Sequence, residues 1–262
     1  MFNVSISNEF RVNVMGGSKG TQVKYLYDGF WYKEDNLGNE GMVEYLVSLI
    51  LKNSTLPECE YVLYEQGIIN GKLGCRSRDF TEYANGTFHT LKNLYIKFTG
   101  RNLDEEVMKI SGFEARRDFV LEFFKKYYDH DLTNYFSKVF TLDLLTLNSD
   151  RHFNNLGVII TSGGLVVDAP LFDNGMSLLN GNYSVRPALG VEYNSTRVTS
   201  KPFSGSPERQ YKLFNHSFFI NYDNLLEDLC EIEDSFQKEL FIFQLEKYRT
   251  KFNSKFSGTS LF

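Results

Sequence analysis

Cysteine is scarce in this chain, which contains only Cys59, Cys75 and Cys230 among its 262 residues. The sequence has no Cys-x-x-Cys pair and no cluster of cysteine with histidine, so we expect neither a zinc site nor a disulfide framework. The chain also lacks the run of ~18 apolar residues that a membrane-spanning helix requires. Its first residues lack the basic start and apolar core of a signal peptide. We therefore expect a cytoplasmic protein without membrane attachment, with secretion left open.

An excess of positive charge is missing as well. The 28 lysine and arginine residues are outnumbered by 33 aspartate and glutamate residues, which gives a net charge of −5. This balance disfavours general binding to nucleic acids or to anionic membranes. The hydrophobic fraction of 42% and the charged fraction of 23% are ordinary for a soluble globular protein. The length allows one large domain or two modest lobes with a sizeable core.

The most informative stretch carries two short motifs on either side of a predicted hairpin. The first motif is Asp-Arg-His-x-x-Asn, which begins at Asp150 and ends at Asn155. The second is Phe-Asp-Asn-Gly, whose aspartate is Asp173. Between them, β-branched segments at 157–160 and 165–168 flank a Ser-Gly-Gly turn, as in a β-hairpin. An acid and an amide on one loop, then a hairpin and a second acid beside glycine, are the parts of a phosphoryl-transfer site.

These residue types predict separate roles in such a site. We expect Asp150 to orient or deprotonate the attacking hydroxyl. We expect Asn155 and Asp173 to bind one or two Mg²⁺ ions, which prefer oxygen ligands. Any one of the three could be an ordinary turn residue. Their spacing around the hairpin nevertheless favours a shared catalytic site made of Asp150, Asn155 and Asp173.

A lysine and a following helix extend the candidate site toward the N-terminus. Residues 30–34 predict a strand that carries Lys33, and residues 38–52 predict an amphipathic helix. A lysine at such a position can reach nucleotide phosphates and pair with a glutamate of the helix. Glu40 and Glu44 lie one helical turn apart, so either could face Lys33. A solvated lysine on an exposed strand is the alternative.

The order of the two motifs resembles the HipA-like protein kinases, most closely their stand-alone CtkA-like members. The Asp-Arg-His-x-x-Asn order also occurs in phosphatidylinositol kinases. The resemblance covers most of the chain, from about residue 16 to the C-terminal helices. It implies an α+β, two-lobed, protein-kinase-like fold. Residues 1–90 would form a small β-rich N-terminal lobe with one helix, and residues 91–262 a larger, mainly helical C-terminal lobe.

The resemblance also implies ATP and Mg²⁺ as cofactors and assigns further residues to the nucleotide. A glycine-rich segment that could approach phosphate oxygens is followed by Gln22 and Lys24, which match a Gly-x-Gln-x-Lys pattern of the family. From the residues alone a plain hairpin turn is the simpler interpretation. Lys33 matches the nucleotide-binding lysine, with Lys24 as the fallback, and Glu44 fits the family spacing better than Glu40. The predicted nucleotide-binding residues are Gly17, Ser18, Gly20, Gln22, Lys33 and Glu44.

The activity that the resemblance implies is transfer of the ATP γ-phosphate to a serine or threonine of a protein, including autophosphorylation, for which Ser18 is a candidate. A lipid or small-molecule kinase and a nucleotide-binding pseudokinase are the alternatives. We expect a protein substrate of unknown identity, and an antitoxin or other regulatory partner stays open. No direct contact with nucleic acid is expected, because the chain begins only some fifteen residues ahead of the glycine-rich segment.

Five further features are less determined by sequence. Arg151 could pair with an acid or with a phosphorylated residue, and His152 is expected to support the loop by hydrogen bonds. Asn154 stands where the longer HipA toxins carry a lysine that could touch the transferring phosphate. Residues 178–211 form either a functional segment or a mobile surface loop, and they include a Lys201-Pro202-Phe203 segment similar to one in the stand-alone members. Residues 79–100 are expected to form an irregular link between the lobes.

Overall fold

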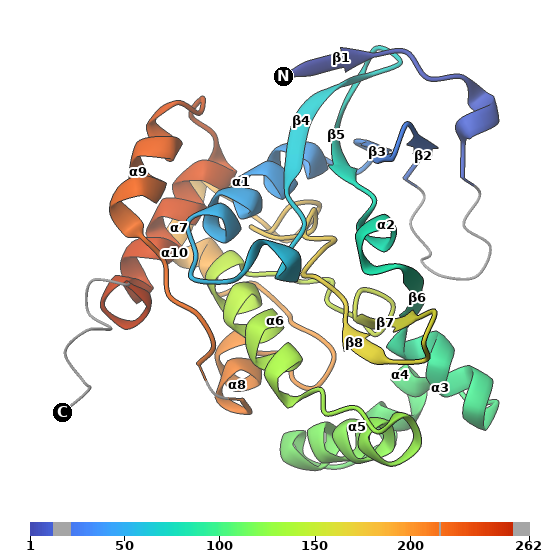
Figure 1. The fold of residues 1–262 in the computed structure, drawn as a ribbon. Helices are drawn as coiled ribbons and strands as arrows, with labels where there is room; N and C mark the ends of the chain where they lie inside the picture. The colour runs from blue at the N-terminus through green and yellow to red at the C-terminus, as the bar shows by residue number, and fades with distance from the viewer. Residues whose placement is uncertain (13–21, 215, 254–262) are drawn as a thin grey trace.

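A five-stranded sheet forms the N-terminal part of the fold in the computed structural model, which describes residues 1–12, 22–214 and 216–253 (Figure 1). Its strand order is β1-β4-β5-β3-β2. β1 runs parallel to β4, whereas the other neighbours are antiparallel. The predicted strand at 30–34 is confirmed. The strands are β1 (Phe2–Val4), β2 (Lys24–Tyr27), β3 (Phe30–Glu34), β4 (Tyr64–Ile69) and β5 (Lys72–Arg78).

The turn between β4 and β5 is tighter than its sequence pattern first suggests. The alternation predicts strands at 61–66 and 72–77 with a turn across 67–71, but β4 continues to Ile69. Asn70 and Gly71 both have positive φ, at 50° and 83°, as a two-residue hairpin turn of type I′ requires. The Asn-Gly pair is therefore the stronger local signal, because few other residues adopt this conformation without strain.

Helix α1 (Glu40–Lys52) covers one face of this sheet and contacts β4 and β5. Its apolar stripe of Val43, Leu46, Val47 and Ile50 is completely buried, as the helical spacing predicted. Burial of aliphatic side chains of this size stabilises the fold by roughly 1.5–3 kcal/mol each. The helix is thereby fixed against one face of the sheet. Its first turns face loops that come later in the chain.

A second sheet of three antiparallel strands, in the order β6-β7-β8, lies beyond α2 from the first sheet, on the side of the molecule away from α9 and α10 (Figure 1). β7 (Gly157–Thr161) and β8 (Val166–Asp168) form the predicted hairpin. The prediction of an irregular segment at 79–100 is wrong, because it contains α2 (Phe80–Ala84), β6 (Gly86–Thr90) and α3 (Leu91–Thr99). β6 pairs with β7 about 70 residues later, and local sequence patterns do not encode such pairing.

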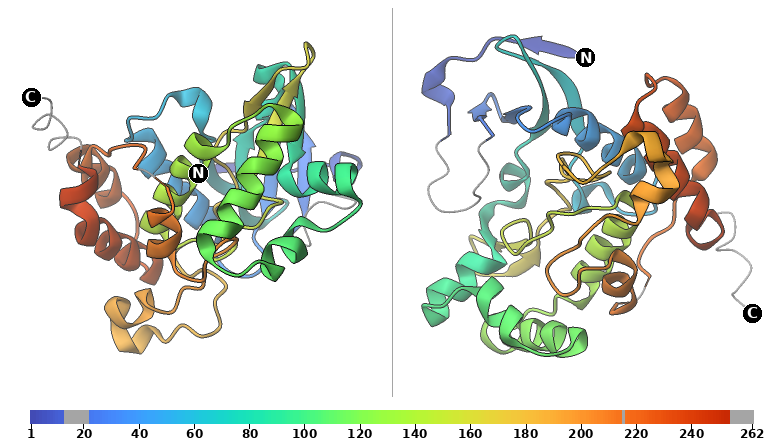
Figure 2. Two further views of the ribbon diagram at one scale, coloured as in Figure 1. Left: turned by 90° about the horizontal axis from the view of Figure 1, so that it is seen from below. Right: turned by 180° about the vertical axis from the view of Figure 1, so that it is seen from behind.

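The remaining chain is mainly helical and packs around α6 (Thr133–Thr146), as two further views show (Figure 2). α6 is buried from Tyr135 to Thr146, and α5 spans Phe113–Tyr128. The segment 178–211 includes two short helices, and several of its residues, such as Leu178, Asn194 and Phe203, are buried. The other helices are α4 (Leu103–Lys109), α7 (Gly190–Ser195), α8 (Pro207–Lys212), α9 (Tyr222–Cys230) and α10 (Phe236–Phe252), and the short 3-10 helices are η1 (Asn8–Phe10), η2 (Glu58–Glu60) and η3 (Pro187–Leu189).

The architecture is α+β, with a β-rich N-terminal part and a larger helical part, as predicted. The lobe boundary at residue 90 stays a prediction, and β6, which ends there, pairs with strands of the second sheet. Within the described ranges, no helix is long and apolar enough to cross a membrane.

Asp35 at the start of α1 makes the stability of the fold depend on pH. Its carboxylate accepts a hydrogen bond from the Gly41 backbone N–H at 2.7 Å, yet burial, together with the nearby Glu40, raises its pKa to about 6. An unfolded chain ionises this group near its ordinary value of 3.8. Between these values the unfolded state binds fewer protons, so the free energy of unfolding falls as the pH rises from about 4 to 6 and stays lower above that range.

We therefore expect Asp35→Asn, which keeps an acceptor oxygen but cannot ionise, to remove this loss. The stability difference between variant and wild type should grow by about 1–2 kcal/mol in favour of the variant from pH 4 to pH 7, since solvent screens the half-buried carboxylate. Urea denaturation across this pH range measures the difference. A difference that does not change with pH would show that the folded chain ionises Asp35 normally.

Candidate active site

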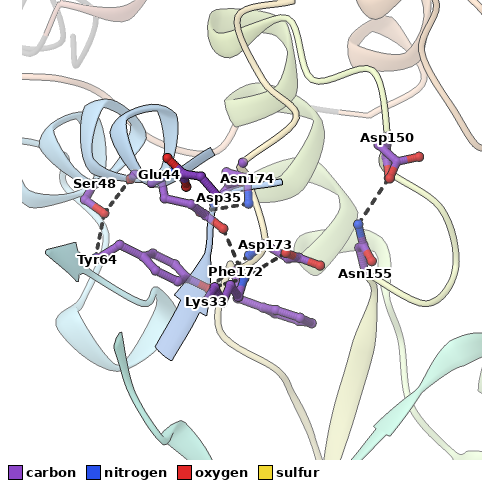
Figure 3. Close-up of polar contacts among 12 residues, drawn as sticks. Lys33, Asp35, Glu44, Ser48, Tyr64, Asp150, Asn155, Phe172, Asp173 and Asn174 are labelled. Atoms are coloured by element: carbon purple, nitrogen blue, oxygen red, sulfur yellow. Dashed lines mark hydrogen bonds and ion pairs between the residues drawn. The ribbon is translucent and has the colours of Figure 1, made fainter. Parts of the chain in front are cut away.

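A buried lysine joins three separate elements at the centre of the site (Figure 3). The Lys33 Nζ on β3 lies 3.1 Å from the Glu44 Oε1 on α1 and 2.8 Å from the Asp173 Oδ1. Asp173 belongs to the Asp173 loop, residues 169–180, which follows β8. Lys33 and Glu44 are only 7% and 2% exposed, so Lys33 is not a solvated strand residue. The structure thus brings together three predicted site residues that are up to 140 positions apart.

The choice between the two glutamates of α1 is now clear. Glu44 binds Lys33 and also accepts a hydrogen bond from the Asn174 backbone N–H at 2.9 Å. The Glu40 carboxylate instead accepts hydrogen bonds from the backbone N–H groups of residues 36–38, at 2.6 to 3.2 Å. Glu40 therefore stabilises the beginning of α1, where an acidic side chain is favourable, and does not contact Lys33.

Tyr64 on β4 completes the surroundings of Lys33 and was not predicted. Its hydroxyl accepts from the Lys33 Nζ at 3.4 Å and from the Asp173 backbone N–H at 3.3 Å. Its own backbone N–H donates to the Ser48 Oγ at 2.8 Å, which ties β4 to α1. The strand pattern at 61–66 does not reveal which groups this hydroxyl contacts.

Opposite charges in this cluster shift the pKa values of Asp173 and Lys33 in opposite directions. Burial alone would raise the pKa of Asp173, but the Lys33 and Lys24 charges outweigh it and hold that pKa far below its ordinary value. Burial likewise opposes the charge on Lys33, yet Asp173, Tyr64 and Glu44 raise its pKa well above the usual range. Asp173 and Lys33 are therefore ionised at neutral pH. Asp173 also has a φ of 59°, in the left-handed region that aspartate tolerates better than most residues.

Lys24 on β2 supplies a second positive charge beside Lys33. The two lysines are direct cross-strand partners and share one face of the sheet. Burial and the Lys33 charge lower the pKa of Lys24, while Asp173 opposes that change. Lys33, and not the fallback Lys24, makes the ion pairs with both carboxylates.

Arg151 is buried and connects the two sequence motifs. Its guanidinium binds the Asp143 carboxylate on α6 through Nε at 3.1 Å and Nη2 at 2.9 Å. It also donates to the Asn174 Oδ1 at 2.6 Å and to the Phe172 carbonyl at 3.0 Å. The sequence left its partner undecided, and the structure assigns it to an acid. One side chain thereby fixes the Asp173 loop against α6.

Asp150 and Asn155 lie on the Asp150 loop, residues 147–156, which joins α6 to β7. The Asn155 Nδ2 donates to the Asp150 carbonyl at 3.1 Å, and the Asn148 Oδ1 accepts from the Asp150 backbone N–H at 2.9 Å. These bonds hold the loop while the Asp150 carboxylate stays 39% exposed. His152 is expected to support the loop by hydrogen bonds, but its Nε2 lies 3.6 Å from the Asp150 Oδ2, beyond hydrogen-bond distance, and its buried Nδ1 has no hydrogen-bond partner among the described residues.

A lysine that the sequence analysis did not assign to the site reaches Asp150 from far along the chain. The Lys201 Nζ lies 3.2 Å from the Asp150 Oδ1. The only sequence signal was its place in the Lys-Pro-Phe segment. Of the other predicted residues, Gln22 lies just before β2, whereas Gly17, Ser18 and Gly20 fall outside the described residues.

The donor atoms around Asp173 suit a magnesium ion that keeps other ligands. Figure 3 shows Asp173 between Lys33 and the Asn155 side chain, so carboxylate and amide oxygens come from two loops. Mg²⁺ prefers such hard oxygen ligands and usually retains water or phosphate oxygens. Across the described parts of the chain, no group of three or more His, Cys, Asp or Glu residues could hold a metal by itself. A metal at this place would therefore depend on ligands from a nucleotide or water.

Comparisons with known proteins support the fold described above. No protein-family model matches the sequence, and no curated protein matches it either. Among solved structures, the chain is similar to the proinflammatory kinase CtkA of Helicobacter pylori, with a TM-score of 0.59, 15% identity and 95% of each chain covered. It also matches HipA of Shewanella oneidensis MR-1, in a complex with HipB and operator DNA, with a TM-score of 0.40, 10% identity, and 98% of this chain and 69% of that chain covered. The chain therefore has the CtkA fold, which confirms the predicted two-lobed, kinase-like architecture.

The buried pair of Arg151 and Asp143 generates a stability prediction. Asp143→Asn removes the negative charge and leaves a buried guanidinium without its counter-ion, which should lower the free energy of unfolding by about 3–5 kcal/mol. Denaturant titration of wild type and variant measures the change. The matched control is Asp129→Asn, which removes the partner of Lys125 in an exposed pair at 3.1 Å. It should change stability by less than about 1 kcal/mol, and equal losses in the two variants would contradict the role of Arg151.

Proposed function

We propose that this protein is a Mg·ATP-dependent kinase that transfers the γ-phosphoryl group to a serine or threonine hydroxyl of a protein, including its own. The observation that carries the proposal is the buried ion-pair cluster of Lys33, Glu44 and Asp173 next to the Asp150 loop. The CtkA fold supports it. A cytoplasmic location and a regulatory or antitoxin partner stay predictions.

Lys33 would bind the α- and β-phosphates of the nucleotide. Glu44 holds the lysine from α1, so its ammonium group is oriented before a ligand arrives. Such preorganisation matters because phosphoryl transfer depends mainly on positioning and electrostatic stabilisation. Lys24 lies opposite Lys33 on the same face and would add positive charge toward the same phosphates.

Asp173 and Asn155 would hold the metal, and Asp150 would receive the acceptor hydroxyl. Asp173 is ionised and now neutralised by Lys33, so nucleotide binding would separate this pair and give each group a new partner. Bound Mg²⁺ would neutralise charge on the phosphates. The half-exposed Asp150 carboxylate is accessible to a hydroxyl from solvent, which fits a residue that orients the acceptor or takes its proton.

Removal of the two acids tests the proposal directly. Purified protein is incubated with labelled ATP and Mg²⁺, with and without a generic acceptor protein. Asp150→Ala and Asp173→Ala should each lower transfer by roughly 10²–10⁴-fold, because one removes the group that handles the proton and the other a metal ligand. Asp118→Ala, at a partly exposed ion pair on α5, is the matched control and should retain activity.

The other outcomes distinguish the alternative functions. Label that appears on a lipid or small molecule and not on protein would contradict the proposal and indicate a lipid or small-molecule kinase. ATP binding without transfer to any acceptor would indicate a pseudokinase. Equal transfer by the wild type and both acid variants would show that the reaction uses another site.

The two lysines of the sheet are expected to differ in their effect on nucleotide binding. Lys33→Met should weaken Mg·ATP binding by roughly 10–100-fold, because charge-assisted hydrogen bonds contribute about 1.5–3 kcal/mol. Lys24→Met should have a smaller effect, since Lys24 is not ion-paired with Glu44 and Asp173 in the way that Lys33 is. Isothermal titration calorimetry with Mg·ATP compares them. A larger loss for Lys24→Met would reverse the assignment of the phosphate-binding lysine.

A further inference from the structure

Lys201 approaches the Asp150 loop from a segment that lies between α7 and α8. Its Nζ is 3.2 Å from the Asp150 Oδ1, and the two side chains are 53% and 39% exposed. An exposed ion pair of this kind contributes little to stability, often less than about 1 kcal/mol. A role for Lys201 therefore has to rest on how the fold positions it and on what it faces.

The backbone around Lys201 is fixed by a completely buried glutamine. Gln210 on α8 is 1% exposed, and its Nε2 donates to the Lys201 carbonyl at 2.7 Å. Its Oε1 accepts from the backbone N–H groups of Phe203 and Ser204, at 2.9 and 3.3 Å. The amide of Gln210 thus binds the chain on both sides of Pro202. Because these groups are buried, a change in the backbone here would leave polar atoms unpaired.

Phe203 attaches the same segment to the Asp150 loop. It is completely buried, and its ring lies 5.9 Å from the ring of Phe153, three residues after Asp150. It also packs against Phe136 and Phe140 of α6, the helix from which the Asp150 loop begins. The position of the Lys201 backbone relative to Asp150 is therefore set by the core, while only the lysine side chain is free to move.

Lys201 differs from the other positively charged residues near Asp150, because those residues are bound by other carboxylates. Arg151, the neighbour of Asp150 in sequence, points into the core and forms an ion pair with Asp143. Lys33 binds Glu44 and Asp173 on the other side of the site. Lys201 is accessible to solvent and carries a positive charge that is held beside the proposed acceptor-binding carboxylate.

We propose that Lys201 is a catalytic residue whose ammonium group contacts the γ-phosphoryl oxygens during transfer. This inference rests on the proposed kinase function. In the reaction the acceptor oxygen forms a bond to the γ-phosphorus, the bond from that phosphorus to the β,γ-bridging oxygen breaks, and ADP leaves with the bond electrons. The hydroxyl proton passes to Asp150. The attacking oxygen lies between Asp150 and the γ-phosphorus, so a cation 3.2 Å from Asp150 is within reach of the transferring group.

The contact between the Lys201 ammonium group and the phosphoryl oxygens is strongest in the transition state, where negative charge develops. Donors that are aimed at developing negative charge accelerate reactions more than they strengthen substrate binding, because they act mainly in the transition state. In the structure Lys201 pairs with Asp150, which keeps its ammonium group at this position. The opposite possibility is that this pair blocks the acceptor hydroxyl, and it predicts a faster enzyme when Lys201 is removed.

The test compares Lys201→Ala, Lys201→Met and Lys201→Arg with wild type in two measurements. The first is the steady-state rate of transfer from Mg·ATP. Loss of the ammonium group should lower kcat by roughly 10²–10³-fold with a much smaller rise in KM for ATP, as for other single donors to transition-state charge. Lys201→Arg should recover part of the rate because it keeps the charge. Lys125→Ala, which breaks an exposed lysine–aspartate pair of similar length on α5, is the control and should behave as wild type.

The second measurement does not require turnover. Calorimetry gives the affinities for Mg·ADP and for a Mg-bound ATP analogue with an imido β,γ bridge. Lys201→Ala should reduce the preference of the protein for the analogue over ADP and leave ADP binding unchanged, since only the analogue carries a γ-phosphate. A thermal unfolding midpoint equal to that of wild type verifies that the variant is folded.

The outcomes separate this inference from the proposed function. Unchanged or increased kcat in Lys201→Ala, with an unchanged preference for the analogue, would overturn the role of Lys201 while the kinase assignment stands. If the wild type transfers no phosphate to any acceptor, the proposed function fails and the binding data decide alone. In that case, loss of the analogue preference in Lys201→Ala supports the γ-phosphate contact, and retention of the preference overturns it.

Discussion

The ion pair between Lys33 and Asp173 is the interaction on which the rest of the site depends. It brings a strand of the first sheet and the loop after β8 within 2.8 Å of each other, and Glu44 extends the contact to α1. A buried ammonium group is strongly unfavourable unless it is paired and hydrogen-bonded. Because Lys33 is buried in the sheet, the elements packed against it have to supply carboxylate partners. Asp173 is one of these partners, and it lies next to the Asp150 loop.

A second buried pair fixes the other half of the site. Arg151 follows Asp150 in sequence but points inward to Asp143 on α6, and from there it reaches the Asp173 loop through Asn174 and the Phe172 carbonyl. The two loops that carry the candidate catalytic groups are thus joined through one guanidinium, whose planar fork allows several hydrogen bonds in fixed directions. The carboxylate of Asp150 can stay partly exposed, because the charges that hold the two loops are buried.

The residues of the candidate site come from four distant parts of the chain. Each part is held in place by its packing against other elements. α1 contributes Glu44 because its apolar stripe is buried on the sheet. The Asp150 loop is held by α6 and by Asn155, and the Lys201 segment is held by Gln210 and Phe203. For phosphoryl transfer, in which positioning dominates, a rigid frame of this kind is the expected design.

The sequence by itself determined the local elements and the types of residue at the site. The strand at Phe30–Glu34, the helix α1 and the β7–β8 hairpin follow from periodicity and turn chemistry, and the motif spacing singled out Asp150, Asn155 and Asp173. Only the tertiary structure decided that Glu44 and not Glu40 meets Lys33, that Arg151 is buried and that Lys201 reaches Asp150. These pairings join residues that are far apart in the chain or on adjacent helical turns. They depend on how whole elements pack, and a local pattern carries no information about that.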